Sequence, residues 1–366
     1  MNTALAAHAA AKNVASGIKV LPLAGRIGAE ICDVNLADIT DTAFSEIREA
    51  LLRHRVLFIR NQENLSIEGH ERFAGMFGTP EAHPTIPPVA NSRFVLELDG
   101  AKGGRANNWH TDTTFTEAPC KVSVLRAIIV PKIGGDTVFA NTVAAYADLP
   151  ENLRHMADNL WARHSNAYDY AARSPKKTHK DADLATKMLQ ATLLHAEHPL
   201  VHIHPETGER ALVLGAFFQR FVGFSQQDSH YLYDLFQRHI TRLENTVRWR
   251  WLPGDVVVWD NFATQHYAID DYGNQERYMQ RVSVRGDAIL HNWSEKSRSS
   301  VEQQLNRITA QLTLGEKGGK DSVDHRHHWR RWFCHRRDTD CGGMDCNRYG
   351  THARTNRGGT KRGAGY

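Results

Sequence analysis

Short apolar runs, separated by polar turns, recur along the chain between about Gly17 and Gly286. Runs of this length that are rich in β-branched and aromatic residues are typical of strands. The strands expected on this pattern are Ile18–Pro22, His54–Ile59, Phe94–Leu98, Ser123–Val130, Leu200–His204, Ala211–Leu214, Thr246–Trp251, Asp255–Trp259 and Met279–Arg285.

Apolar positions three and four residues apart predict a smaller number of helices. The expected helices are Asp41–His54, Ser66–Phe77, Glu151–Ala162 and Gln226–Thr241, with Asp41 as the N-cap of the first. The run Pro205–Gly208 predicts a hairpin turn. Many short strands, few β-α-β units and no Gly-rich phosphate loop favour a β-sandwich or barrel with helical insertions.

The composition of the 366 residues, 41% hydrophobic and 23% charged, is that of a globular protein. No stretch approaches the roughly 18 uncharged apolar residues of a membrane span, so no membrane association is expected. The five cysteines are an odd number and do not suggest a disulfide framework. We therefore expect a cytoplasmic protein.

The net charge of +4 is concentrated at one end of the chain. Residues 321–366 contain ten Lys or Arg against five Asp, so the first 320 residues are close to neutral. A near-neutral body lacks the electrostatic footprint of a nucleic-acid-binding protein, and no nucleic-acid partner is expected.

The same composition shift predicts the domain organisation. We expect a flexible N-terminus over 1–16, one catalytic domain over 17–290, a short helical extension over 291–320 and a disordered Gly/Arg/His-rich tail over 321–366. Three cysteines interleaved with histidines leave a small zinc site in the tail as an alternative. A basic RNA-binding tail and an altered reading frame are further alternatives.

The pattern with the clearest chemistry is the pair His110 and Asp112. In an extended strand, residues two apart point to the same face, so these two side chains can meet at one point. His266, which follows a very apolar strand, is the best candidate for a third ligand. Two histidines and one carboxylate on one face of a metal form the facial triad of non-haem Fe(II) oxygenases.

Chance pairs of this kind are expected in a chain with 21 histidines. His195, His198, His202 and His204 also lie close in sequence, but no carboxylate shares their spacing and we interpret them as structural. Arg277 and Arg281, soon after His266, support the metal interpretation, because two guanidinium groups on one face of a strand can hold an anionic cosubstrate or substrate.

With these residues in place, the chain resembles the taurine dioxygenase family of Fe(II)/2-oxoglutarate-dependent dioxygenases over residues 17–286. Within that family it is most similar to the alkyl sulfatases, which are sulfate ester dioxygenases. The matching segments, besides Arg277 and Arg281, are Trp109–Phe115 (WHTDTTF), Gly134–Thr137 (GGDT), His204–Arg210 (HPETGER), Glu244–Trp251 (ENTVRWRW), Gly254–Asn261 (GDVVVWDN) and Thr264–Tyr272 (TQHYAIDDY).

The resemblance implies a double-stranded β-helix, or jelly roll, and an Fe(II) ion held by His110, Asp112 and His266. It implies that 2-oxoglutarate chelates this iron, with its far carboxylate held by Thr137 and Arg277. O2 is the second cosubstrate of the family.

The resemblance also assigns residues to the substrate. Arg281 would act at the catalytic centre, near the cosubstrate's C1 carboxylate and the sulfur-bearing anion of the substrate. His83 matches a family histidine that contacts this anion, and the backbone N–H of Thr113 is a further candidate donor. The expected partner is thus a small anionic organosulfur compound, and the family suggests a homo-oligomer.

The expected reaction hydroxylates the carbon that bears a sulfate ester and yields an aldehyde, sulfate, succinate and CO2. The alternatives within the family are a dioxygenase for taurine or another sulfonate, which would release sulfite, and one for aryloxyalkanoates. Arg105 and Ala106 stand where taurine enzymes carry an acidic residue and an amide, which disfavours an amine substrate. A non-catalytic metal-binding jelly roll and a hydrolytic sulfatase are the alternatives from other classes.

Overall fold

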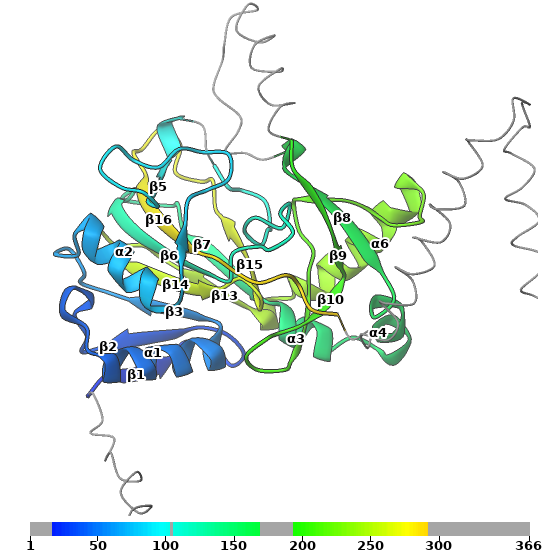
Figure 1. Cartoon of the computed structure of the whole chain (residues 1–366), viewed down its shortest axis with the longest axis horizontal. Coiled ribbons are helices and arrows are strands. Elements are labelled where there is room, and N and C mark those ends of the chain that lie inside the picture. The colour runs from blue at the N-terminus through cyan, green and yellow to red at the C-terminus, as the bar shows by residue number, and fades with distance from the viewer. Residues whose placement is uncertain (1–16, 103–104, 169–192, 292–366) are drawn as a thin grey trace, which may run out of the picture. The chain divides into compact units, whose positions relative to one another are not determined.

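Two β-sheets form the frame of the computed structural model, which describes residues 17–102, 105–168 and 193–291 (Figure 1). The large sheet has the strand order β1 (Lys19–Pro22), β2 (Ala29–Cys32), β3 (Val56–Ile59), β14 (Val256–Asp260), β6 (Val122–Ile129), β16 (Tyr278–Val284) and β4 (Pro80–Glu81), with β5 (Leu96–Asp99) also paired to β16. The small sheet has the order β13 (Thr246–Trp249), β7 (Thr137–Asn141) and β15 (Thr264–Ala268). All pairings in both sheets are antiparallel except β2 with β3.

The side chains of the large sheet alternate between two hydrophobic clusters. On β14, Val257 and Trp259 belong to the cluster shared with the small sheet, together with Phe139 of β7. Val256 and Val258 of the same strand face the opposite cluster. Because both faces of β14 are buried, its sequence is an unbroken apolar run. The two facing sheets with helical insertions form a jelly roll, as predicted.

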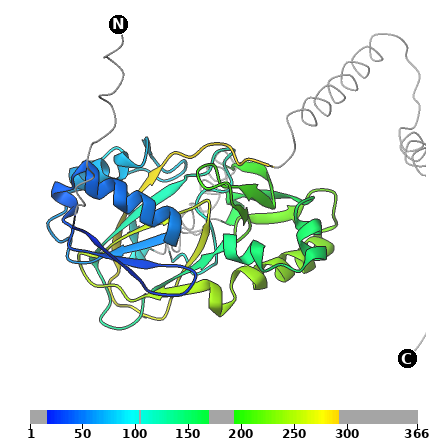
Figure 2. The ribbon, with the colours of Figure 1, turned by 90° about the horizontal axis from the view of Figure 1, so that it is seen from below.

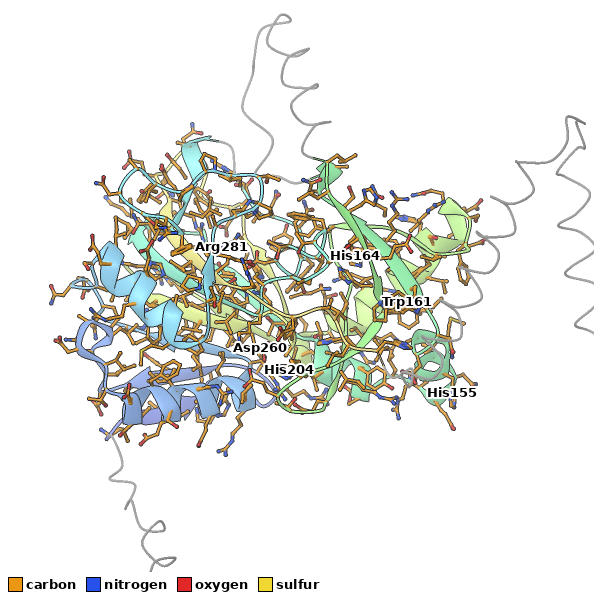
Figure 3. All side chains as sticks on the ribbon, in the orientation of Figure 1. His155, Trp161, His164, His204, Asp260 and Arg281 are labelled. Carbon is orange, nitrogen blue, oxygen red and sulfur yellow. The ribbon has the colours of Figure 1, made fainter. Side chains whose placement is uncertain are left out.

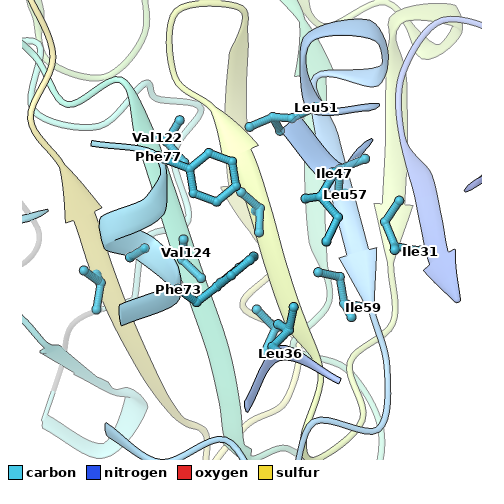
Figure 4. Close-up of a cluster of buried hydrophobic side chains, with 14 of the residues drawn as sticks. Ile31, Leu36, Ile47, Leu51, Leu57, Ile59, Phe73, Phe77, Val122 and Val124 are labelled. Atoms are coloured by element: carbon cyan, nitrogen blue, oxygen red, sulfur yellow. The ribbon is translucent and has the colours of Figure 1, made fainter. Parts of the chain in front are cut away.

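Two helices cover the outer face of the large sheet (Figures 1 and 2). They are α1 (Asp41–His54) and α2 (Ile67–Met76). Figure 4 shows Ile47 and Phe73 of these helices in contact with the aliphatic side chains of the sheet. The first helix has the predicted span, but its N-cap is Thr40, whose hydroxyl accepts from the Ala43 amide, whereas Asp41 is already helical.

A second group of elements lies beside the two sheets (Figure 1). A three-stranded sheet has the order β12 (Phe218–Phe221), β8 (Trp161–Ser165) and β9 (His195–Pro199), and the predicted hairpin joins β10 (Val201–Ile203) to β11 (Arg210–Leu212). The helices of this group are α3 (Thr142–Ala147), α4 (Glu151–Ala157) and α6 (Gln226–Ile240). Short 3-10 turns occur at Leu36–Asp38, Gly100–Lys102, Asn166–Tyr168 and Leu243–Asn245.

One predicted element is partly wrong. The helix expected over Glu151–Ala162 ends at Ala157, and Trp161 and Ala162 belong to β8 instead. Ala162 is fully buried while Trp161 is partly exposed, which is the two-residue alternation of a strand. Several short strands, among them β7 and β15, were not predicted.

The expected N-terminal segment, the helical extension beyond 291 and the basic tail with its three cysteines lie outside the described residues. Among the residues that the structure describes, no helix is long and apolar enough to cross a membrane.

Candidate metal and cosubstrate site

Three predicted residues meet between the sheets. One ligand atom from each of His110, Asp112 and His266 lies within 4.8 Å of the other two, and all three side chains are buried. No other group of this kind occurs among the residues that were searched, those described in the structure. His198, His202 and His204 do not join it, in agreement with their structural interpretation.

The two histidines are joined through their backbones. His110 donates its amide to the carbonyl of His266 at 3.0 Å, and His266 donates to the carbonyl of His110 at 2.8 Å. His266 lies within β15, whereas His110 forms only this isolated bridge. The prediction that His110 and Asp112 share a strand is therefore wrong, because Asp112 begins a turn in which Thr113 has φ +53°. Their convergence is nevertheless as predicted.

The donor atoms of the cluster fit a cation. Nδ1 of His110 lies 2.7 Å from the carbonyl of Asn108, so this nitrogen carries the proton and Nε2 is a lone-pair acceptor. That Nε2 is 3.8 Å from Oδ1 of Asp112, and Nε2 of His266 is 3.9 Å from the same oxygen. Two imidazole nitrogens and one carboxylate arranged in this way are suited to a divalent transition metal.

Charge and burial hold these groups in the ligating state. Burial by itself raises the pKa of Asp112, but the nearby Arg281 and, after it, the two imidazoles outweigh this and hold the pKa well below its ordinary value. Burial and the neighbouring His110 lower the pKa of His266 well below its ordinary value. The carboxylate is therefore ionised and the imidazole is neutral, as metal binding requires.

A buried hydrogen-bond network fixes the second oxygen of Asp112. Ser123 of β6 donates its hydroxyl to Oδ2 of Asp112 at 2.8 Å and accepts from the amide of Asn261 at 2.9 Å. Asn261 in turn accepts the indole N–H of Trp259 at 3.0 Å. Oδ2 thus points to Ser123, whereas Oδ1 faces the two imidazoles. The sequence reasoning missed Ser123 and Asn261, although Asn261 lies in a motif of the family resemblance.

The structural histidines anchor the segments that carry the ligands. Nε2 of His198 donates to the carbonyls of Thr114 and Thr116, at 2.9 and 3.0 Å. Nε2 of His202 lies 2.7 Å from the carbonyl of Phe262. The side chains of His204 and Asp260 lie side by side in Figure 3, with Nε2 of His204 2.8 Å from Oδ2 of Asp260.

The predicted cosubstrate residues line a cavity beside the cluster. Thr137, Arg277, Arg281 and His266 all line it, so both arginines reach the same space as predicted. The Nε–H of Arg277 donates to the carbonyl of Gly135 at 3.1 Å. Arg281, labelled in Figure 3, is buried and is paired with Oδ1 of Asp112 at 2.5 Å. The site therefore places cationic charge next to the metal ligands.

Arg105 lines the same cavity, but its charge is engaged. Its guanidinium forms an ion pair with Asp270 and stacks over the ring of Tyr272 at 4.5 Å. The sequence argument that Arg105 would repel an amine substrate is weakened, because Asp270 neutralises it.

The predicted substrate residues lie near the ligands. Burial and Arg281 lower the pKa of His83 to about 3, so this side chain is neutral near pH 7. Nδ1 of His83 accepts the amide of Thr85 at 3.3 Å, which leaves the proton on Nε2. The ring centre of Phe115 lies 6.3 Å from that of His83, and the ring centre of Phe217 lies 4.9 Å from that of Phe115. The Thr113 hydroxyl accepts from the amide of Cys120 at 3.0 Å, so a role in anion binding would fall to its backbone N–H.

The fold and the three ligands define a metal-dependent oxygenase of the two-histidine, one-carboxylate class. Residues 19–283 match the family model "Taurine catabolism dioxygenase TauD, TfdA family", and the chain belongs to that family. Membership implies Fe(II), 2-oxoglutarate and O2, and the His110–Asp112–His266 cluster fits this set.

Several characterised relatives are similar over most of their length. An alpha-ketoglutarate-dependent sulfate ester dioxygenase of Pseudomonas putida is 51% identical, covering 80% of this chain and 94% of that protein. An alkylsulfatase of Acinetobacter baylyi is 45% identical, covering 80% and 93%. The crystal structure of a taurine dioxygenase from Burkholderia xenovorans superimposes with a TM-score of 0.63 at 35% identity, covering 75% and 91%.

Proposed function

We propose that this protein is an Fe(II)/2-oxoglutarate-dependent dioxygenase that hydroxylates the carbon bearing the sulfate ester of an alkyl sulfate. The observation that carries the proposal is the buried His110–Asp112–His266 cluster beside a cavity that contains Arg277 and Arg281. The sulfate ester relative at 51% identity supports the choice of substrate.

His110, Asp112 and His266 would hold the iron. When bound, the metal couples the oxidative decarboxylation of 2-oxoglutarate by O2, which yields succinate and CO2, to insertion of one oxygen atom into a substrate C–H bond. The hydroxylated carbon then loses sulfate as its C–O bond to the ester breaks and the new hydroxyl group gives up its proton, leaving an aldehyde.

The chain's own residues bind and orient the two anions. Thr137 and Arg277 hold the far carboxylate of 2-oxoglutarate, because a hydroxyl donor and a guanidinium in one cavity suit a carboxylate. Arg281 supplies positive charge where the cosubstrate and the sulfate group approach the ligands. His83 and the Thr113 amide contribute neutral N–H donors to the sulfate oxygens. The rings of Phe115 and Phe217, whose centres lie 4.9 Å apart, add apolar surface beside His83 and His110.

The test is anaerobic loading with Fe(II), followed by exposure to O2 with 2-oxoglutarate and one candidate substrate. A medium-chain alkyl sulfate, taurine and an aryloxyalkanoate are compared, with succinate, sulfate and sulfite quantified. We expect sulfate in equal amount to succinate with the alkyl sulfate. Sulfite from taurine, or succinate coupled only to the aryloxyalkanoate, would assign a different substrate class.

A control separates this reaction from hydrolysis. A hydrolytic sulfatase would release sulfate without O2 or 2-oxoglutarate, so omission of either must abolish sulfate release. A cytoplasmic location, a homo-oligomeric state and the lack of a nucleic-acid partner stay predictions from the sequence.

A further inference from the structure

The hydroxyl of Thr137 has a buried hydrogen-bond partner on the side of the core. The indole Nε1–H of Trp251 donates to Oγ1 of Thr137 at 2.9 Å. The two residues are 4% and 3% exposed, so water does not compete for this bond. They meet because Trp249 of β13 pairs directly with Thr137 of β7, which brings the residues after β13 beside the start of β7.

The direction of this bond determines where the hydroxyl proton goes. An indole N–H can only donate, whereas a hydroxyl has one proton and two acceptor lone pairs. Since Thr137 accepts from Trp251, its own proton points away from the indole and is free to be donated elsewhere. Within the described part of the chain, this hydroxyl forms no second hydrogen bond.

The cavity is the place to which the proton can be directed. Thr137 lines it together with Arg277, whose Nε–H donates to the carbonyl of Gly135, two residues before Thr137. The hydroxyl and the guanidinium are thus both tied to the start of β7. An anion that enters the cavity meets a cation and an O–H group, one lone pair of which already accepts from Trp251.

We propose that Trp251 is a positioning residue for 2-oxoglutarate, which turns the Thr137 hydroxyl into a dedicated donor to the far carboxylate. Without the indole N–H, the hydroxyl can rotate and the bond to the carboxylate loses its preorganisation. The inference rests on the proposed function, since it needs 2-oxoglutarate in this cavity.

The competing explanation is that Trp251 only fills the core, where it belongs to the cluster between the two sheets. Trp249 provides a matched control. It is also 4% exposed, belongs to the same cluster, and donates its indole N–H to a side-chain oxygen, that of Asp255, at 3.1 Å. Trp251→Phe and Trp249→Phe therefore make the same chemical change, but only the first removes the partner of Thr137.

The experiment measures binding without turnover. Mn(II)-loaded protein is titrated calorimetrically with 2-oxoglutarate and with 2-oxovalerate, which carries a methyl group in place of the far carboxylate. We expect Trp251→Phe to weaken the binding of 2-oxoglutarate by about 3- to 10-fold and to leave the binding of 2-oxovalerate unchanged. Trp249→Phe should bind both like the unaltered protein. In a Thr137→Val background, Trp251→Phe should have no further effect.

Other results would overturn the inference. Equal weakening of both ligands by Trp251→Phe, or no weakening of either, would leave Trp251 as a packing residue. If Trp251→Phe does not fold, 3-benzothienylalanine at position 251 removes the N–H at nearly constant shape, and the same expectations apply. If the unaltered protein does not bind 2-oxoglutarate at all, the proposed function fails and the inference fails with it.

Discussion

Replacing Ser123 by alanine tests how the site holds Asp112. Ser123 is completely buried and donates to the carboxylate oxygen that does not face the two imidazoles. A hydrogen bond to a charged group contributes about 1.5–3 kcal/mol. The free energy of unfolding should fall by that amount. With Oδ2 released, the carboxylate can rotate, and loss of such an outer partner typically weakens metal binding about 10- to 100-fold.

Two measurements check this expectation. Urea unfolding of the metal-free protein gives the stability, and a competition titration with a chelator gives the affinity for Fe(II) or Co(II). Ser283→Ala is the matched control, because Ser283 is 8% exposed and pairs directly with Ser123 across β16 and β6. An unchanged metal affinity in Ser123→Ala, or an equal loss in Ser283→Ala, would refute the reasoning.

Three further changes have defined outcomes. Gly215→Ala should destabilise the fold by about 1–3 kcal/mol in urea unfolding, since φ is +111° and the new methyl group would lie 2.9 Å from the Trp109 carbonyl; an unchanged midpoint would contradict this. Burial lowers the pKa of His70 to about 4, so the unfolded chain takes up this proton first, and His70 alone should lower the stability by about 2 kcal/mol between pH 7 and pH 5. Urea titrations at both pH values should show a smaller fall in His70→Gln. Arg277→Ala should weaken the binding of 2-oxoglutarate about 10- to 100-fold by calorimetry, and normal affinity would show that Arg277 does not hold its far carboxylate.

The strand that the sequence marks most clearly is β14, which is buried on both faces. The run Val256–Trp259 is apolar throughout, because one face packs on α1 and α2 and the other on the small sheet. By contrast, β15 reads Thr264-Gln265-His266 at its start, and β7 begins at Thr137. These strands turn polar side chains toward the site, so their apolar alternation is interrupted and the pattern gives no signal.

The ligands themselves were predictable from residue type and spacing, but their supports were not. His110 and Asp112 were identified by their two-residue spacing, although a turn and not a strand brings them together. Ser123 and Trp251 acquire their roles only in the folded chain. The fold places Ser123 of β6 beside Asp112, and Trp251, two residues after β13, beside Thr137. A serine and a tryptophan in apolar surroundings carry no mark of this in the sequence.

The reciprocal backbone hydrogen bonds between His110 and His266 have a consequence for redesign. These bonds use main-chain atoms, which every residue has, so the backbone separation of the two ligand residues does not require particular side chains around the site. Residues of the cavity wall, such as Leu98 and Ile269, are therefore the positions to vary in a library, whereas Phe217, whose ring centre lies 6.0 Å from that of His110, is kept. The chain thus separates the part that must stay constant from the part that can be varied to accept a new substrate.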